Sequence, residues 1–153
     1  MLPLLLLLAA GATRAQQLGG GGGPAEGAYV RGGADGLTQY FGQRLDHFDR
    51  QETRTWAQRY FANDSAFVVA GPVFLCVGGE GAPLTAEVVT TGGPHCALMV
   101  EHAAAAGALV LALEHRYYGK SLPVGDFETA SLRQLSSQQA LADLIGNRFG
   151  ESE

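Results

Sequence analysis

The chain has 153 residues, about the length of one average domain, and 46% of them are hydrophobic. Together with a mean hydropathy near zero, this composition excludes a fibrous or disordered chain and indicates a globular one. The formal charge is −5, and the ten basic residues form no cluster. The sequence therefore lacks the basic patch that nucleic-acid binding requires, and we expect no DNA or RNA partner.

The chain begins with an apolar segment. Five leucines at 4–8 and two alanines lead into the small residues Ala10-Gly11-Ala12. This run is shorter than the about 20 apolar residues of a membrane-spanning helix, but it has the length and the small-residue end of a secretory signal peptide. We predict a signal peptide at residues 1–15, cleaved after Ala12 or Ala15, entry into the secretory pathway, and no membrane partner after cleavage.

Residues 16–36 contain the glycine run 19–23 and few large apolar side chains. A segment of this kind buries too little apolar surface to offset the entropy of ordering it. We therefore predict a flexible, glycine-rich linker at 16–36, followed by the folded part of the chain at 37–153.

The folded part opens with a predicted β-hairpin. Loose alternation in residues 40–49 favours an edge strand, and residues 55–61 favour a second strand. The polar, charged residues 49–54 between them predict a longer hairpin loop.

A strand–helix–strand unit is predicted next. Residues 73–77 and 108–113 are short apolar runs, typical of central strands that are buried on both faces. Between them, the alanine-rich residues 97–106 predict a helix that ends at Gly107. Two strands joined in this way are parallel in nearly all known cases, so the sequence predicts an α/β fold.

A last helix is predicted from Ser136 or Ser137 to Ile145, with serine as its cap and apolar residues at 140, 141, 144 and 145. In open α/β sheets the functional site lies beyond the carboxyl ends of the strands. The informative loops are therefore 78–83 and 114–123.

The secretory route gives meaning to three further residues, because disulfides persist in oxidising compartments. We expect Cys76, inside an apolar run, to be a buried and inert thiol. Cys96 follows a Gly-Gly-Pro loop and is the better disulfide candidate, with its partner outside this sequence. Asn63-Asp64-Ser65 matches the acceptor pattern for N-linked glycosylation and predicts a sugar on Asn63 in an exposed turn.

Five blocks between residues 41 and 145 carry a family resemblance. In chain order they are Q-R-L-D-H-F at 43–48, T-W-A-Q-R-Y-F at 55–61, G-G-E-G-A-P at 78–83, E-H-R-Y-Y-G-K-S-L-P at 114–123 and L-S-S-Q-Q-A-L-A-D at 135–143. Together they resemble the amino-terminal part of the serine exopeptidase family that contains prolyl carboxypeptidase, dipeptidyl peptidase II and thymus-specific serine protease. The E-H-R-Y-Y-G-K-S block is specific to this family.

The resemblance implies a partial α/β-hydrolase domain at 37–153, comprising a hairpin and then strand, helix, strand and helix, with an incomplete sheet. It implies secreted or lysosomal residence, and cleavage of short peptides near a proline or small residue by a Ser-His-Asp triad. Gly79, Glu80 and Gly81 would form the loop that supplies one N–H of the oxyanion hole. No cofactor is implied.

The triad itself is expected outside this sequence, because the family's G-x-S-x-G nucleophile motif occurs nowhere in it. We therefore expect a peptidase truncated before its nucleophile, inactive alone. One alternative is a non-catalytic fragment that acts, if at all, through partner binding at an open sheet edge. Another is a different α/β-hydrolase activity, such as an esterase.

The polar residues after the second buried strand invite a catalytic interpretation, which we reject. Neighbours on a strand point to opposite faces, so Glu114 and His115 cannot act as a carboxylate and the base it orients. Buried polar groups must be paired, which favours a structural network beneath the active site. That network is predicted to comprise Glu114, His115, Arg116, Tyr117 and Tyr118.

The remaining histidines receive structural interpretations as well. Asp46 and His47 are expected to form a hydrogen-bonded pair, and Glu101 and His102 to lie on the solvated face of a helix. His95 adjoins Cys96, but one such pair without further ligands at metal spacing is poor evidence for zinc, and we predict no metal.

Overall fold

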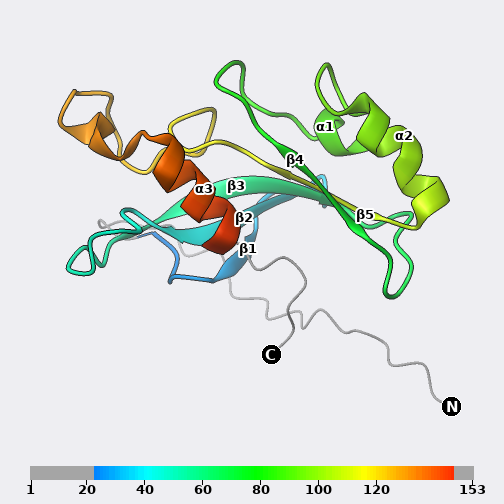
Figure 1. The fold of residues 1–153 in the computed structure, drawn as a ribbon, viewed down its shortest axis with the longest axis horizontal. Coiled ribbons are helices and arrows are strands. Elements are labelled where there is room, and N and C mark those ends of the chain that lie inside the picture. The colour runs from blue at the N-terminus through cyan, green and yellow to red at the C-terminus, as the bar shows by residue number, and fades with distance from the viewer. Residues whose placement is uncertain (1–22, 147–153) are drawn as a thin grey trace, which may run out of the picture.

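A mixed five-stranded sheet organises residues 23–146, the part of the chain that the computed structural model describes (Figure 1). The predicted signal peptide, the first part of the predicted linker at 16–22 and the last residues, 147–153, lie outside the described residues. In their order across the sheet, the strands are β1 (Tyr29–Arg31), β2 (Thr38–Arg44), β3 (Thr55–Asn63), β5 (Leu109–Leu113) and β4 (Val73–Val77). Adjacent strands are antiparallel except β4 and β5, which are parallel.

The predicted hairpin is confirmed as β2 and β3, which pair from Thr38 opposite Phe61 to Arg44 opposite Thr55. Its first strand is not at the edge, because β1 pairs along its outer side. The linker prediction is therefore wrong at residues 29–31. The Tyr29 ring packs edge-on against Phe41 and Tyr60, with ring centres 4.9 and 6.1 Å apart, so two aromatic contacts anchor a segment that is otherwise poor in apolar side chains.

The predicted strand–helix–strand unit is also confirmed. The helix α2 (Ala97–Ala106) has the predicted bounds, and Gly107 ends it in the left-handed conformation with φ at 62°. A short helix, α1 (Glu87–Thr90), precedes it and was not predicted. After β5, the short 3₁₀ helix η1 (Ser131–Gln134) leads to α3 (Ser137–Gly146), where the Ser136 hydroxyl accepts a hydrogen bond from the Gln139 N–H as predicted for a capping serine.

The prediction that β4 is a central strand, buried on both faces, is wrong for the described sheet. Since β5 lies between β3 and β4, β4 is at the edge, and the side chains of Val73, Leu75 and Val77 are 38–51% exposed. An apolar run such as 73–77 does not by itself show whether other described residues cover both faces of the strand or leave it exposed.

Helices pack on both faces of the sheet. On one face, α1 and α2 cover a cluster that contains Phe61, Cys76 and Val110. On the other face, Leu144 of α3 packs against a cluster with Tyr60 and Leu113. In this arrangement α1 contacts β3 and β5, α2 contacts β4 and β5, and α3 contacts β2 (Figure 1). This arrangement confirms the α/β class and the predicted order of strands and helices.

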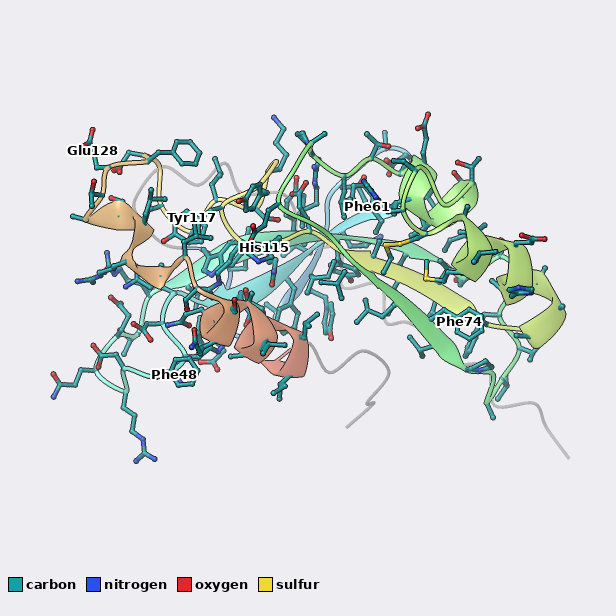
Figure 2. The ribbon with its side chains drawn as sticks, turned by 45° about the horizontal axis from the view of Figure 1, so that its top comes forward. Phe48, Phe61, Phe74, His115, Tyr117 and Glu128 are labelled. Carbon is teal, nitrogen blue, oxygen red and sulfur yellow. A yellow bond between two sulfur atoms is a disulfide. The ribbon has the colours of Figure 1, made fainter. Side chains whose placement is uncertain are left out.

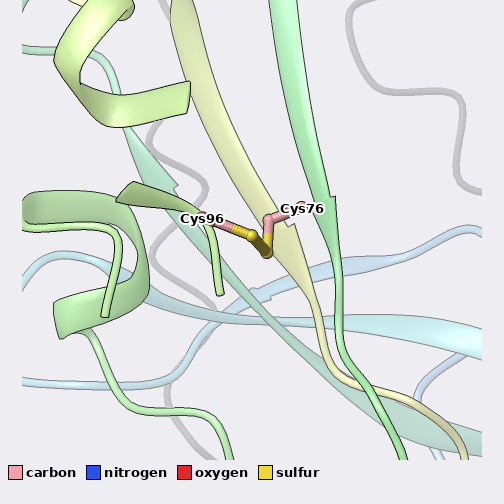
Figure 3. The surroundings of a disulfide bond; sticks show 2 residues. All are labelled: Cys76 and Cys96. Atoms are coloured by element: carbon pink, nitrogen blue, oxygen red, sulfur yellow. A yellow bond between two sulfur atoms is a disulfide. The ribbon is translucent and has the colours of Figure 1, made fainter. Parts of the chain in front are cut away.

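The two cysteines form a disulfide with each other, which corrects both cysteine predictions. Cys76 on β4 is joined to Cys96 at the start of α2, with their Cα atoms 6.2 Å apart (Figure 3). Cys76 is therefore buried but not a free thiol, and Cys96 has its partner within this sequence. The bond ties α2 to the edge strand that it covers.

Candidate functional site

The two loops singled out above follow the parallel strands β4 and β5 and lie at the same edge of the sheet. A pocket of about 210 Å³ opens there between the strand ends and α3, and its lining includes Val77, His115 and Leu141. In Figure 2, His115 and Tyr117 lie in the chain between β5 and η1. The first loop, at 78–83, is a candidate for binding through its backbone, and the second, at 114–123, for holding the first in place.

The glycine loop is held at its base and open at its centre. The Gly78 N–H donates to the Leu113 carbonyl at 2.8 Å, which continues the pairing of β4 with β5. Among the described residues, no acceptor binds the N–H groups of Gly79, Glu80 or Gly81, all of which are exposed. A Cβ atom on Gly79 or Gly81 would meet nothing within 4 Å, so the chain's own packing does not require these glycines.

Glu114 is 1% exposed and its carboxylate accepts five hydrogen bonds. Arg59 on β3 donates to both oxygens through Nε and Nη2. The Leu84 N–H donates to Oε1 at 3.1 Å, and the Lys120 N–H and Ser121 hydroxyl donate to Oε2 at 2.9 Å each. Glu114 therefore connects β3, the end of the glycine loop and the turn after β5.

The turn after β5 is shaped around this carboxylate. Gly119 has φ at 56°, and a Cβ atom there would overlap the Glu114 carboxylate. Tyr117 also has a positive φ, at 68°, and its hydroxyl donates to the Ser131 carbonyl at 2.6 Å. Tyr118 lies edge-on to His115 with ring centres 5.3 Å apart. Within 114–121, the packing around one buried anion explains the glycine at 119.

Arg116 forms a second buried cluster on the α3 face. It is fully buried, and its guanidinium donates to both carboxylate oxygens of Asp143 at 2.7 and 2.8 Å. It also donates to the carbonyls of Gln134 at 2.9 Å and Leu45 at 3.3 Å. His47 Nε2 lies 2.8 Å from Asp143 Oδ1. This cluster fixes α3 against β2 and the hairpin loop.

The expected network of residues 114–118 thus divides into two. Glu114 and Arg116 face different partners, and His115, between them, contacts the Arg116 carbonyl through Nδ1 at 2.7 Å. The expected Asp46–His47 pair is not formed. Asp46 instead accepts a hydrogen bond from the Gln139 side chain, while His47 faces Asp143, because the hairpin loop packs on α3.

Asn63 lies at the end of β3 and is only partly exposed. Its Nδ2 atom, to which a sugar would be attached, donates to the Val89 carbonyl at 2.8 Å, and its Oδ1 accepts from the Ser65 N–H. The expected exposed turn is present at Asp64 and Ser65 rather than at Asn63 itself. Glycosylation of Asn63 stays a prediction.

Sequence reasoning missed Arg59 and Asp143, which neutralise the two buried charges. A signal for each was present. Arg59 stands among apolar and aromatic residues in a predicted strand, and Asp143 lies within the apolar positions of a predicted helix. A charged residue on a face that is otherwise apolar indicates a buried ion pair.

Two groupings that would carry chemistry are absent from the described residues. Between residues 23 and 146, no histidine hydrogen-bonds to a serine hydroxyl, and no three His, Cys, Asp or Glu side chains are grouped as metal ligands. In the same part of the chain, no helix is long and apolar enough to cross a membrane. His102 and Glu101 are exposed on α2, as expected.

Comparison with known proteins identifies relatives of this chain. The family described as "Serine carboxypeptidase S28" matches residues 43–148. The chain is 48% identical over 111 residues to the thymus-specific serine protease of Homo sapiens, covering 72% of this chain and 20% of that protein. It is 36% identical over 107 residues to the lysosomal Pro-X carboxypeptidase of Homo sapiens, covering 68% and 21%. The chain spans about a fifth of the length of these relatives.

Proposed function

Since the chain belongs to the serine carboxypeptidase S28 family, we propose that it is the amino-terminal part of a serine-type exopeptidase that cleaves short peptides. The resemblance predicted from the five sequence blocks is thereby confirmed, and the family is one of α/β-hydrolases. The observation that carries the proposal is the match over residues 43–148, which includes both loops at the strand ends.

In this proposal the reaction is acyl transfer by a Ser-His-Asp triad supplied by residues outside the described part of the chain. The serine attacks the peptide carbonyl, whose oxygen becomes negatively charged in the tetrahedral intermediate. Gly79, Glu80 and Gly81 contribute at least one backbone N–H to that oxygen. Support comes from the position of the loop beyond β4 and from its exposed residues 79–81, whose N–H groups have no acceptor among the described residues.

The proposal includes a secreted or lysosomal location. One matched relative is named as lysosomal, and another, from Arthroderma benhamiae, as a probable extracellular serine carboxypeptidase. The apolar amino-terminal segment and the Cys76–Cys96 disulfide agree with an oxidising compartment.

The experiment is performed on the full-length protein that contains this chain. Wild-type enzyme is expected to react with a fluorophosphonate probe and to hydrolyse proline-containing peptide reporters in preference to ester reporters. Failure of both the labelling and the peptide hydrolysis would exclude the proposed activity, and preference for esters would favour an esterase.

A Gly81→Val variant tests the role of the loop. A side chain at this position meets no described residue, so the fold is expected to be preserved while the substituent hinders approach to the backbone. We expect kcat to fall by about 10²- to 10³-fold with little change in KM, since one oxyanion donor has that effect. Normal turnover would show that the loop does not bind the oxyanion.

A second candidate function is partner binding by the chain alone. It is favoured by the edge of β4, which pairs with no strand on its outer side within the described residues and carries three exposed apolar side chains. Expression of the 153-residue chain tests it. A monomer without bound protein at micromolar concentration would exclude this alternative.

A further inference from the structure

The glycine loop is fastened at two points, and the second point depends on a charge outside the loop. Its first residue is held by the sheet, through the Gly78 N–H and the Leu113 carbonyl. The residue that follows its last is Leu84, whose N–H donates to Glu114 Oε1 at 3.1 Å and whose carbonyl accepts from Arg59 Nη2 at 2.9 Å. The Arg59–Glu114 ion pair therefore binds both the N–H and the carbonyl of Leu84.

The other oxygen of the same carboxylate is held from the opposite side. Glu114 Oε2 accepts from the Lys120 N–H and the Ser121 hydroxyl, and Arg59 Nε donates to it at 3.1 Å. The Ser121 hydroxyl oxygen in turn accepts from the Arg59 N–H at 2.9 Å. Glu114 therefore cannot turn without breaking bonds to β3 and to the turn after β5, and its position defines that of Leu84.

A carboxylate fits this set of partners better than an amide would. All five groups around the two oxygens are donors, and a carboxylate provides about four acceptor sites and no proton. An amide at the same place would turn an NH₂ group toward donors on one side. It would lose the bond from the Leu84 N–H or the bond from the Lys120 N–H, whereas the Ser121 hydroxyl can turn to accept.

We propose that Glu114 is a positioning residue for catalysis, which holds the loop at 79–83 so that its N–H groups face the developing oxyanion. The inference rests on the proposed peptidase function and adds to it a residue that does not touch the substrate. The alternative is that Glu114 only stabilises the fold. In that case its replacement would leave the chemical step unchanged in folded enzyme.

The test compares wild-type, Glu114→Gln and Glu52→Gln forms of the full-length enzyme with a peptide reporter. Glu52 is the matched control, because its carboxylate also accepts hydrogen bonds from an arginine, Arg54, but contacts neither loop. We expect Glu114→Gln to lower kcat by about 10²-fold, the effect of a displacement of about 1 Å in a catalytic group, with KM changed little. Glu52→Gln is expected to leave both constants unchanged.

Affinity for a transition-state analogue separates the two roles, because it would not change if Glu114 only stabilised the fold. A peptide boronate or aldehyde is expected to bind Glu114→Gln more weakly by the same factor as the fall in kcat/KM, whereas a substrate-like ground-state inhibitor keeps its affinity. Amide hydrogen exchange at Leu84, whose N–H donates to Glu114, is expected to be faster in the variant. Folded Glu114→Gln enzyme with wild-type kcat and analogue affinity would overturn the proposal.

If Glu114→Gln does not fold, Ser121→Ala decides the question. It removes one donor and leaves the carboxylate charged, so a smaller fall in kcat at constant KM is expected, and wild-type kinetics would overturn the inference. A wild-type enzyme that neither cleaves the reporter nor binds the fluorophosphonate would instead refute the peptidase proposal itself.

Discussion

Replacement of Asp143 by asparagine is the sharpest test of how α3 is attached. The substitution keeps the shape of the side chain and removes its charge. Asp143 is 1% exposed and Arg116 is 0% exposed, so the guanidinium would stay buried without its counter-ion. The asparagine NH₂ group would also face one of the Arg116 donors that now bind at 2.7 and 2.8 Å.

The expected loss follows from these contacts. The carbonyls of Gln134 and Leu45 still accept from Arg116, but neither is charged. Removing one partner of a buried ion pair costs about 3–5 kcal/mol, because the remaining charge has no compensation. We expect the free energy of unfolding of the full-length protein to fall by that amount, measured as the shift of the urea midpoint multiplied by the slope of the transition.

Two further variants separate the charge from the packing. A double substitution, Arg116→Met with Asp143→Leu, is expected to cost less than Asp143→Asn, since paired apolar groups leave no buried charge. Arg54→Ala removes a side chain that is 59% exposed in its ion pair with Glu52, and is expected to change the midpoint little. A loss below about 1 kcal/mol for Asp143→Asn would refute the assignment of α3 docking to this pair.

Three other predictions concern single contacts. Gly119→Ala places a side chain at a φ of 56° and against a buried carboxylate, and is expected to lower the unfolding free energy by at least about 1–2 kcal/mol; an unchanged urea midpoint would contradict this. Cys96→Ser opens a bond between residues separated by 20 positions and is expected to cost about 3 kcal/mol; stability equal to that of the oxidised protein would contradict the Cys76 link. The backbone N–H of Phe48 holds the pKa of Asp46 below its ordinary value of 3.8, so the extra stability of wild type over Asp46→Ala is expected to be full above that pH and to disappear as the pH falls below it, and a difference constant from pH 7 to pH 2 would exclude it.

Elements whose determinants are local were predicted well. The helix at 97–106 needs only its alanines and a glycine that can adopt the left-handed conformation at 107, and both are visible in the sequence. The same holds for the serine cap of α3 and for the two strands of the hairpin, whose alternation is a property of neighbouring residues. For these elements tertiary packing only reinforced a preference that the segment already had.

The failures concern contacts between distant segments. Arg59 and Glu114 are 55 positions apart, and they meet only because β3 lies beside β5 in the sheet. Cys76 and Cys96 meet because α2 folds back on β4. Neither arrangement follows from hydrophobic periodicity, which reports the face of an element and not its neighbour. The sequence therefore predicted where the loop at 78–83 lies, but it did not predict that Arg59 pairs with the Glu114 carboxylate that holds this loop.

The position of β5 between β3 and β4 has a consequence for biosynthesis. β5 pairs antiparallel with β3 on one side and parallel with β4 on the other, yet it is made after both. As the chain leaves the ribosome, β4 therefore has no partner strand among the described residues until 109–113 have been synthesised. Its apolar side chains stay unpaired with a neighbouring strand during that time. Pairing that spans such distances along the chain is slow. While residues 77 to 109 are being synthesised, the exposed apolar surface of β4 is therefore open to aggregation.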